Sequence, residues 1–127
     1  MRTRAILGIV LGALVFASGF AHAFLGWPPL GEALAQAGLD SDTSRALRVG
    51  WNFGSAAMFA FGLIVAGNGM ALLRGGDPPA APVWIVAAAF FFFGLGAFLR
   101  ASRSAHFVAF MVIGVLAGLF AWRRRRS

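Results

Sequence analysis

Few side chains in this sequence can do chemistry, and most of those that can are cations or hydrogen-bonding groups. The 127 residues contain eleven arginines, two histidines and no cysteine. Without thiols, disulfide exchange, thiolate catalysis and Cys-ligated metals are excluded. The polar candidates recur near the ends of apolar runs, and we expect them to form a ligand site. They are His22, Arg45, Arg48, Asn52, Ser55, Arg100, Arg103 and His106.

These residue types suit an anionic or amphipathic ligand. Arginine offers forked donors that match phosphate and carboxylate groups. Asn52 lies inside an apolar run, where an unpaired amide is costly, so we expect it to face protein or water. Together with Ser55 it either bonds neighbouring helices to each other or lines a pocket.

The two histidines allow another interpretation, in which His22 and His106 are axial ligands of a haem between facing helices. Both lie at helix ends, where such a haem would be half exposed. A zinc or copper site would need further ligands, and the nearby acids Glu32, Asp40 and Asp42 fall in an expected loop. We therefore expect no cofactor and no metal. We also expect no nucleophile–base pair within the spans, and hence no enzyme.

The composition indicates a membrane protein. Hydrophobic residues make up 60% of the chain and charged residues 12%, whereas soluble domains are about 45–50% apolar. The net charge of +7 comes from arginines at the ends of apolar runs. This placement favours contact with membrane lipids and control of topology, and it does not favour nucleic-acid binding.

Four segments approach the roughly 20 apolar residues that a spanning helix needs. The fold predicted is an all-α, integral membrane four-helix bundle in one domain, residues 1–127. The expected spans cover about residues 5–25, 49–73, 82–99 and 105–122.

The long connection, residues 26–44, is expected to lie outside the cytoplasm. Trp27-Pro28-Pro29 should interrupt regular helix. Residues 30–37 should form a short interfacial helix that ends at Gly38, and residues 40–44 should cap the next helix. A tight turn over residues 100–104 predicts that the last two helices are an antiparallel pair.

The arginines and tryptophans predict the orientation. With both termini cytoplasmic, Arg2, Arg4, Arg74 and Arg123–Arg126 lie inside and only four arginines lie outside. Trp27 and Trp51 then mark the outer interface, and Trp84 and Trp122 the inner one. We expect a multi-pass protein of the bacterial inner (plasma) membrane.

Ala21-His22-Ala23 is also the pattern of a signal-peptidase site, and cleavage there would remove residues 1–23. The apolar run before it, residues 5–20, is at or above the length of a signal's apolar region. Small residues also recur on one helix face, which a removable signal does not need. That face comprises Gly8, Gly12, Val15, Gly19 and His22. We expect the first helix to be retained.

The nearest thing to a motif is His22 at the end of the first span with Gly50-Trp51-Asn52-Phe53-Gly54-Ser55 at the start of the second. In its layout the whole chain resembles small uncharacterised four-span bacterial inner-membrane families, including those similar to DoxX. The resemblance implies the four-span fold and carries no activity.

The function expected is a non-enzymatic membrane protein that binds an amphipathic or anionic ligand, or a partner subunit, near its outer face. One alternative is a small transporter or channel formed as a homo-oligomer through glycine faces. These faces are Gly8/Gly12/Gly19, Gly50/Gly54 and Gly114/Gly118. Another alternative is a haem-binding redox subunit that uses His22 and His106.

Overall fold

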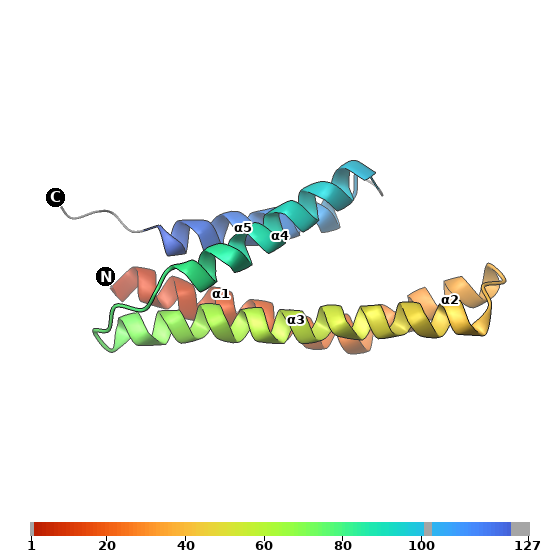
Figure 1. Ribbon diagram of the computed structural model, residues 1–127, viewed down its shortest axis with the longest axis horizontal. Coiled ribbons are helices and arrows are strands. Elements are labelled where there is room, and N and C mark those ends of the chain that lie inside the picture. The colour runs from red at the N-terminus through yellow and green to blue at the C-terminus, as the bar shows by residue number, and fades with distance from the viewer. Residues whose placement is uncertain (1, 101–102, 123–127) are drawn as a thin grey trace. The chain divides into compact units, whose positions relative to one another are not determined.

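The computed structural model describes residues 2–100 and 103–122, and this part of the chain is helical without any strand (Figure 1). The prediction of an all-α fold is confirmed. The elements, in chain order, are α1 (Arg2–Phe20), the π-helix η1 (Ala21–Gly26), α2 (Trp27–Gln36), α3 (Ser41–Leu73), α4 (Ala81–Arg100) and α5 (Ala105–Ala121).

Three helices are long and apolar enough to cross a membrane, and α5, with 17 residues, is a shorter apolar helix. The first of the three runs without a break through α1, η1 and α2 and has 35 residues, and α3 has 33. At 1.5 Å per residue these helices are about 52 and 50 Å long. A bilayer core is about 30 Å thick, so each is longer than one crossing requires.

The prediction that Trp27-Pro28-Pro29 interrupts the helix is wrong, because Trp27 begins α2 directly after η1. Pro28 and Pro29 cannot donate to the carbonyls one turn earlier, and their rings crowd those carbonyls. The π-helix η1, with its wider turn, ends directly before Trp27. Both prolines therefore fall in the first turn of α2, where a missing N–H is tolerated.

The connection between α2 and α3 is a four-residue turn, shorter than the expected loop over residues 26–44. Gly38 has a φ of 75°, which confirms it as the residue that ends the preceding helix. The Oδ1 atom of Asp40 accepts hydrogen bonds from the backbone amides of Asp42 (3.1 Å) and Thr43 (2.9 Å). This cap starts α3 at Ser41, eight residues before the expected span.

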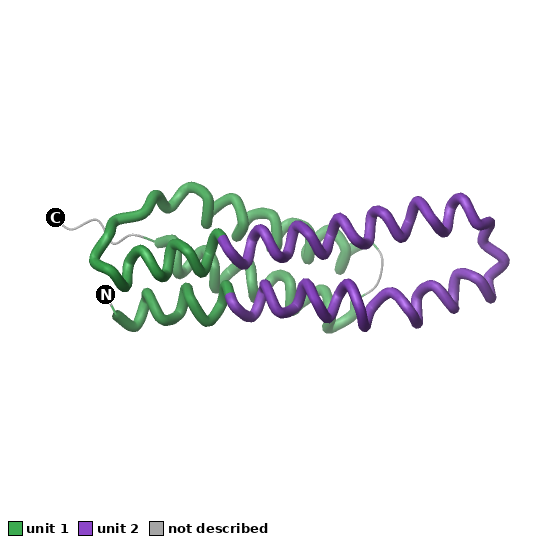
Figure 2. The backbone as a smooth tube through the Cα atoms, turned by 90° about the horizontal axis from the view of Figure 1, so that it is seen from below, with its two compact units in different colours: residues 1–12, 64–127 green, residues 13–63 purple. Residues whose placement is uncertain are grey.

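The chain divides into two compact units, which Figure 2 shows in different colours. Residues 13–63 form the hairpin unit, in which the end of α1, η1 and α2 run antiparallel to the first part of α3. Residues 1–12 and 64–127 form the bundle unit, which holds the start of α1, the end of α3, and α4 and α5.

Close approach of backbones holds α4 and α5 together in the bundle unit. A Cβ atom at Gly94 would lie 2.8 Å from the Phe107 carbonyl oxygen, and one at Gly114 would lie 2.7 Å from the Ala87 carbonyl oxygen. Residue numbers therefore rise on one helix as they fall on the other, which confirms the predicted antiparallel pair. The turn predicted between them includes residues 101–102, which lie outside the described residues.

The small-residue face predicted on the first helix is packed. Gly8, Gly12, Val15 and Gly19 are all buried. In the bundle unit a Cβ atom at Gly8 would lie 2.5 Å from the Phe120 ring, and in the hairpin unit one at Gly19 would lie 2.7 Å from the Phe59 ring. The face thus allows close helix contact, as small residues do in membrane helices.

Candidate functional site

A polar cluster joins η1 to α3 inside the hairpin unit. We call His22, Trp51 and Ser55 the His22 cluster. The Nδ1 atom of His22 lies 2.8 Å from Ser55 Oγ, and the Trp51 indole N–H donates to the His22 carbonyl at 2.7 Å. The imidazole also stacks on the indole, with ring centroids 4.0 Å apart and an interplanar angle of 10°. Three contacts of different kinds therefore fix one histidine to two residues one turn apart on α3.

Glycines make room for this cluster. A Cβ atom at Gly26 would lie 2.6 Å from the Trp51 ring, so a larger residue there would displace the indole. A Cβ atom at Gly54 would lie 3.4 Å from His22 Cε1, which is ordinary contact. The position of η1 matters as well, because π-turns occur frequently at functional sites and here one carries His22.

We expected no hydroxyl or thiol paired with a base within the spans. That expectation is wrong for one pair of side chains, because His22 and Ser55 are hydrogen-bonded. The Ser55 side chain is only 3% exposed, and its Oγ also lies 3.3 Å from the Trp51 carbonyl oxygen. The hydroxyl can accept a hydrogen bond from His22 Nδ1–H while it donates to that carbonyl, or it can donate to Nδ1 in the other tautomer. The backbone amides beside Ser55 lie within α3, so they are not aimed at a developing oxyanion. The pair joins η1 to α3 through a hydrogen bond to a buried hydroxyl.

A second aromatic layer extends the cluster toward α2. The rings of Trp27 and Trp51 meet edge to face, with centroids 6.1 Å apart, and the Arg48 guanidinium carbon lies 5.9 Å from the Trp27 ring centroid. Such a cation–π contact is worth about 0.5–1 kcal/mol at an exposed site. Trp27 and Trp51 are thus in direct contact, while their expected place at the outer interface stays a prediction.

The side of α3 next to the cluster is open. We call Arg45, Arg48, Asn52, Phe53, Ala56 and Leu63 the exposed stripe, since all six are exposed and recur at helical spacing. Phe53 is 75% and Leu63 62% exposed. Along the helix the stripe changes from arginines through an amide to apolar side chains. Arg45 lies 3.8 Å from Asp42, an exposed ion pair of little energetic weight.

The other three predicted site residues belong to the bundle unit. Arg100, Arg103 and His106 are exposed there. The His106 ring packs edge to face on Phe107 and Phe110, and its backbone N–H donates to Ser104 Oγ, which caps α5. The gathering of all eight residues into one site stays a prediction. Within the hairpin unit, His22 and Ser55 are in contact, and Arg48 is joined to them through the two indoles.

Sequence reasoning missed the role of Trp51 and Gly26 in holding His22. The signal was present in part, because Trp51 and Ser55 are four residues apart and share a helix face. Over residues 2–100 and 103–122, no group of three or more His, Cys, Asp or Glu side chains could hold a metal ion. Residues Arg123–Arg126, expected to anchor the chain to anionic lipid, lie outside the described residues.

Comparisons with known proteins add no relative: no family model, curated protein or solved structure matches the chain. The function must therefore be argued from its own residues.

Proposed function

We propose that this is a multi-pass protein of the bacterial inner membrane, with four spans and both termini in the cytoplasm. The three long apolar helices and the apolar α5 support four crossings. The 17 residues of α5 extend about 26 Å, so this helix crosses upright or in a thinned bilayer. The distribution of arginines, seven against four, supports the orientation.

We further propose that the protein is a non-enzymatic binding protein whose exposed stripe takes an anionic amphiphile. The observation that carries this proposal is the order of side chains along the stripe. Arg45 and Arg48 match an anionic head, Asn52 offers both a donor and an acceptor below it, and Phe53 and Leu63 match an apolar tail. A phospholipid and a fatty acid share this chemistry.

The His22 cluster supports the proposal because it holds the helix that carries the stripe. Ser55 and Trp51 lie on the packed side of α3, where they bind His22. The stripe is thus presented on a helix whose rotation is fixed by contacts next to it. A preorganised surface loses less conformational entropy when a ligand binds.

The polar groups of the stripe also need a partner within the membrane. Asn52 is exposed between Val49, 66% exposed, and Phe53. An amide turned toward lipid tails loses its hydrogen bonds to water, which is costly. A ligand headgroup that bonds to Asn52 removes that cost.

The experiment is native mass spectrometry of the protein purified in mild detergent, titrated with phosphatidylglycerol or phosphatidylcholine. We expect one phosphatidylglycerol to be lost, with at least threefold weaker binding, in Arg48→Gln and in Asn52→Leu. The matched control is Arg100→Gln, which removes an exposed arginine at the end of α4, in the other unit and outside the stripe. Equal binding in wild type and Arg48→Gln would refute the proposal.

A further inference from the structure

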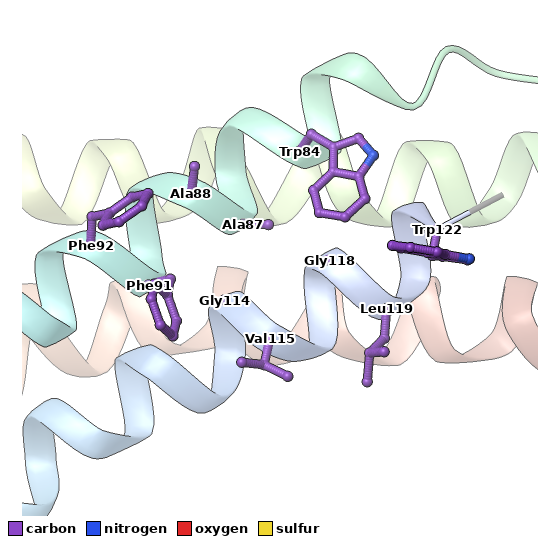
Figure 3. A pocket seen from close by; sticks show the side chains of 10 residues that line it. All are labelled: Trp84, Ala87, Ala88, Phe91, Phe92, Gly114, Val115, Gly118, Leu119 and Trp122. Atoms are coloured by element: carbon purple, nitrogen blue, oxygen red, sulfur yellow. The ribbon is translucent and has the colours of Figure 1, made fainter.

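The bundle unit contains an apolar pocket of about 460 Å³ between α4 and α5 (Figure 3). Its volume lies within the range of ligand pockets in proteins. Every residue that lines it is apolar or a tryptophan, and the walls are formed by Trp84, Phe91 and Phe92 of α4 with Val115 and Leu119 of α5 and the following Trp122. The pocket belongs to neither the His22 cluster nor the exposed stripe.

Small residues create the space between the aromatic walls. Ala87, Ala88, Gly114 and Gly118 line the pocket where larger side chains would fill it. A Cβ atom at Gly114 would lie 2.7 Å from the Ala87 carbonyl oxygen, so the two backbones close the pocket at its floor. A helix packs with its axis about 8–10 Å from its neighbours, so another helix would lie over this groove rather than fill it. A single acyl chain is thin enough to enter the groove.

Two tryptophans lie together at one end of the pocket. The rings of Trp84 and Trp122 meet edge to face with centroids 6.5 Å apart. Figure 3 shows both indole nitrogens directed away from the end where Phe91 and Phe92 lie. Tryptophan favours the membrane interface, where its ring contacts apolar groups and its N–H contacts polar ones. This end of the pocket therefore suits the junction between an acyl chain and a headgroup.

Positive charge gathers at the same end of the bundle unit. The Arg4 side chain donates from Nε to the Phe120 carbonyl at 2.8 Å, which places the start of α1 beside the end of α5. Arg2 is exposed on that first turn. The turn after α3 adds Arg74 and one acid, Asp77. Cations thus outnumber acids around an apolar groove.

We propose that this groove binds one acyl chain of an anionic phospholipid, whose phosphate lies at the Trp84 and Trp122 end near the arginines. The proposal is independent of the exposed stripe. It follows from the apolar lining, the tryptophan pair and the charge, which together match an apolar tail, an interface and an anionic head.

The test uses vesicles in which a fixed fraction of one lipid carries dibrominated acyl chains, which quench nearby tryptophan fluorescence. The emission from Trp84 and Trp122 is obtained as the difference between wild type and the double variant Trp84→Phe/Trp122→Phe. We expect brominated phosphatidylglycerol to quench this emission at least twofold more than brominated phosphatidylcholine at the same mole fraction. Equal quenching by the two lipids would overturn the proposal.

A groove-filling variant locates the effect. Ala88→Phe places a ring in the pocket from an exposed position on α4, and Ala109→Phe, on an exposed position of α5 outside the pocket, is the matched control. We expect Ala88→Phe to abolish the twofold preference and Ala109→Phe to keep it. A preference that survives in Ala88→Phe, or an equal loss of preference in Ala109→Phe, would overturn the proposal.

Crossed variants separate this site from the exposed stripe. Arg74→Gln should reduce the phosphatidylglycerol preference at Trp84 and Trp122, whereas Arg48→Gln should leave it unchanged. If Arg48→Gln loses its ligand in mass spectrometry and the quenching preference is absent, the stripe is a site and the groove is not. If Arg48→Gln keeps its ligand in mass spectrometry and the quenching preference is present, the groove is a site and the stripe is not.

Discussion

The hairpin unit and the α4–α5 pair solve the same problem, the contact of apolar helices, in two different ways. In the hairpin unit, His22, Trp51 and Ser55 join η1 to α3 through directional hydrogen bonds and one stacked ring pair. Between α4 and α5 the contact rests on Gly94 and Gly114, where the two backbones are so close that a Cβ atom would not fit between them. In lipid there is little hydrophobic force between helices, so packing and hydrogen bonds must supply the contact.

This difference indicates which substitutions each helix contact can tolerate. A contact made by close backbone approach fails when one atom is added, because the neighbouring backbone cannot move aside. A contact made by three polar and aromatic groups loses only one part when a side chain is truncated. The comparison therefore predicts a ranked set of effects.

The largest effect is expected from Gly114→Ala. The added Cβ atom would lie 2.7 Å from both the Ala87 carbonyl oxygen and the Phe91 amide nitrogen. The helices must separate, and we expect a loss of about 2–3 kcal/mol in the free energy of unfolding, as for an overpacked core. Unfolding in mixed micelles with a denaturing detergent measures it.

The control for that variant is Gly96→Ala in α4, the other helix of the pair, where nothing lies within 4 Å of the added atom. It should be neutral or stabilise the helix by up to about 1 kcal/mol, because alanine has the higher helix propensity. Equal destabilisation by the two substitutions would contradict the backbone-contact account of the α4–α5 pair.

An intermediate effect is expected from Ser55→Ala. It leaves His22 Nδ1 without the hydroxyl 2.8 Å away, while the stacking on Trp51 remains. Side-chain hydrogen bonds between membrane helices are worth about 0.6 kcal/mol on average and up to about 1.7 kcal/mol. We expect a loss of about 1 kcal/mol in the same unfolding measurement. Ala56→Ser on the exposed stripe should change stability far less, and a comparable loss there would remove the case for a specific His22–Ser55 bond.

The smallest effect concerns Asp40 at the start of α3. A hydrogen bond from the Thr43 side chain, then bonds from the backbone amides of Thr43 and Asp42, lower the pKa of Asp40 below its ordinary value of 3.8. The lowered pKa means that the cap's contribution is complete above pH 3.8 and is lost as the pH falls through the lower, folded value.

Chemical shifts of the Thr43 amide, followed by NMR from pH 6 downward, would report this titration. We expect a midpoint below 3.8 in the wild type and no titration in Asp40→Asn, which keeps an acceptor for the cap but cannot ionise. A midpoint above the ordinary value would contradict the assigned hydrogen bonds.

Local patterns were sufficient for much of the fold. The apolar runs determine helices because a lipid-covered backbone must satisfy its own hydrogen bonds. The small-residue face with Gly8 and Gly19 predicted close helix contact, and Gly38 predicted where α2 stops, since both are properties of neighbouring positions along one helix. Pro28 and Pro29 led to the wrong prediction of a helix break, because the sequence does not show that a π-turn before two prolines lets the helix continue.

The chain's own residue order thus determined that it is helical, which helices are long and apolar enough to cross a membrane, and which side chains could do chemistry. Only the tertiary structure decided that His22 meets Ser55 across 33 positions of sequence, with Trp51 stacked on the imidazole. It also decided that Asn52 lies on the exposed side of α3. The reason is rotational: spacing along a helix fixes which residues share a face, but packing against a neighbour fixes which face is turned inward.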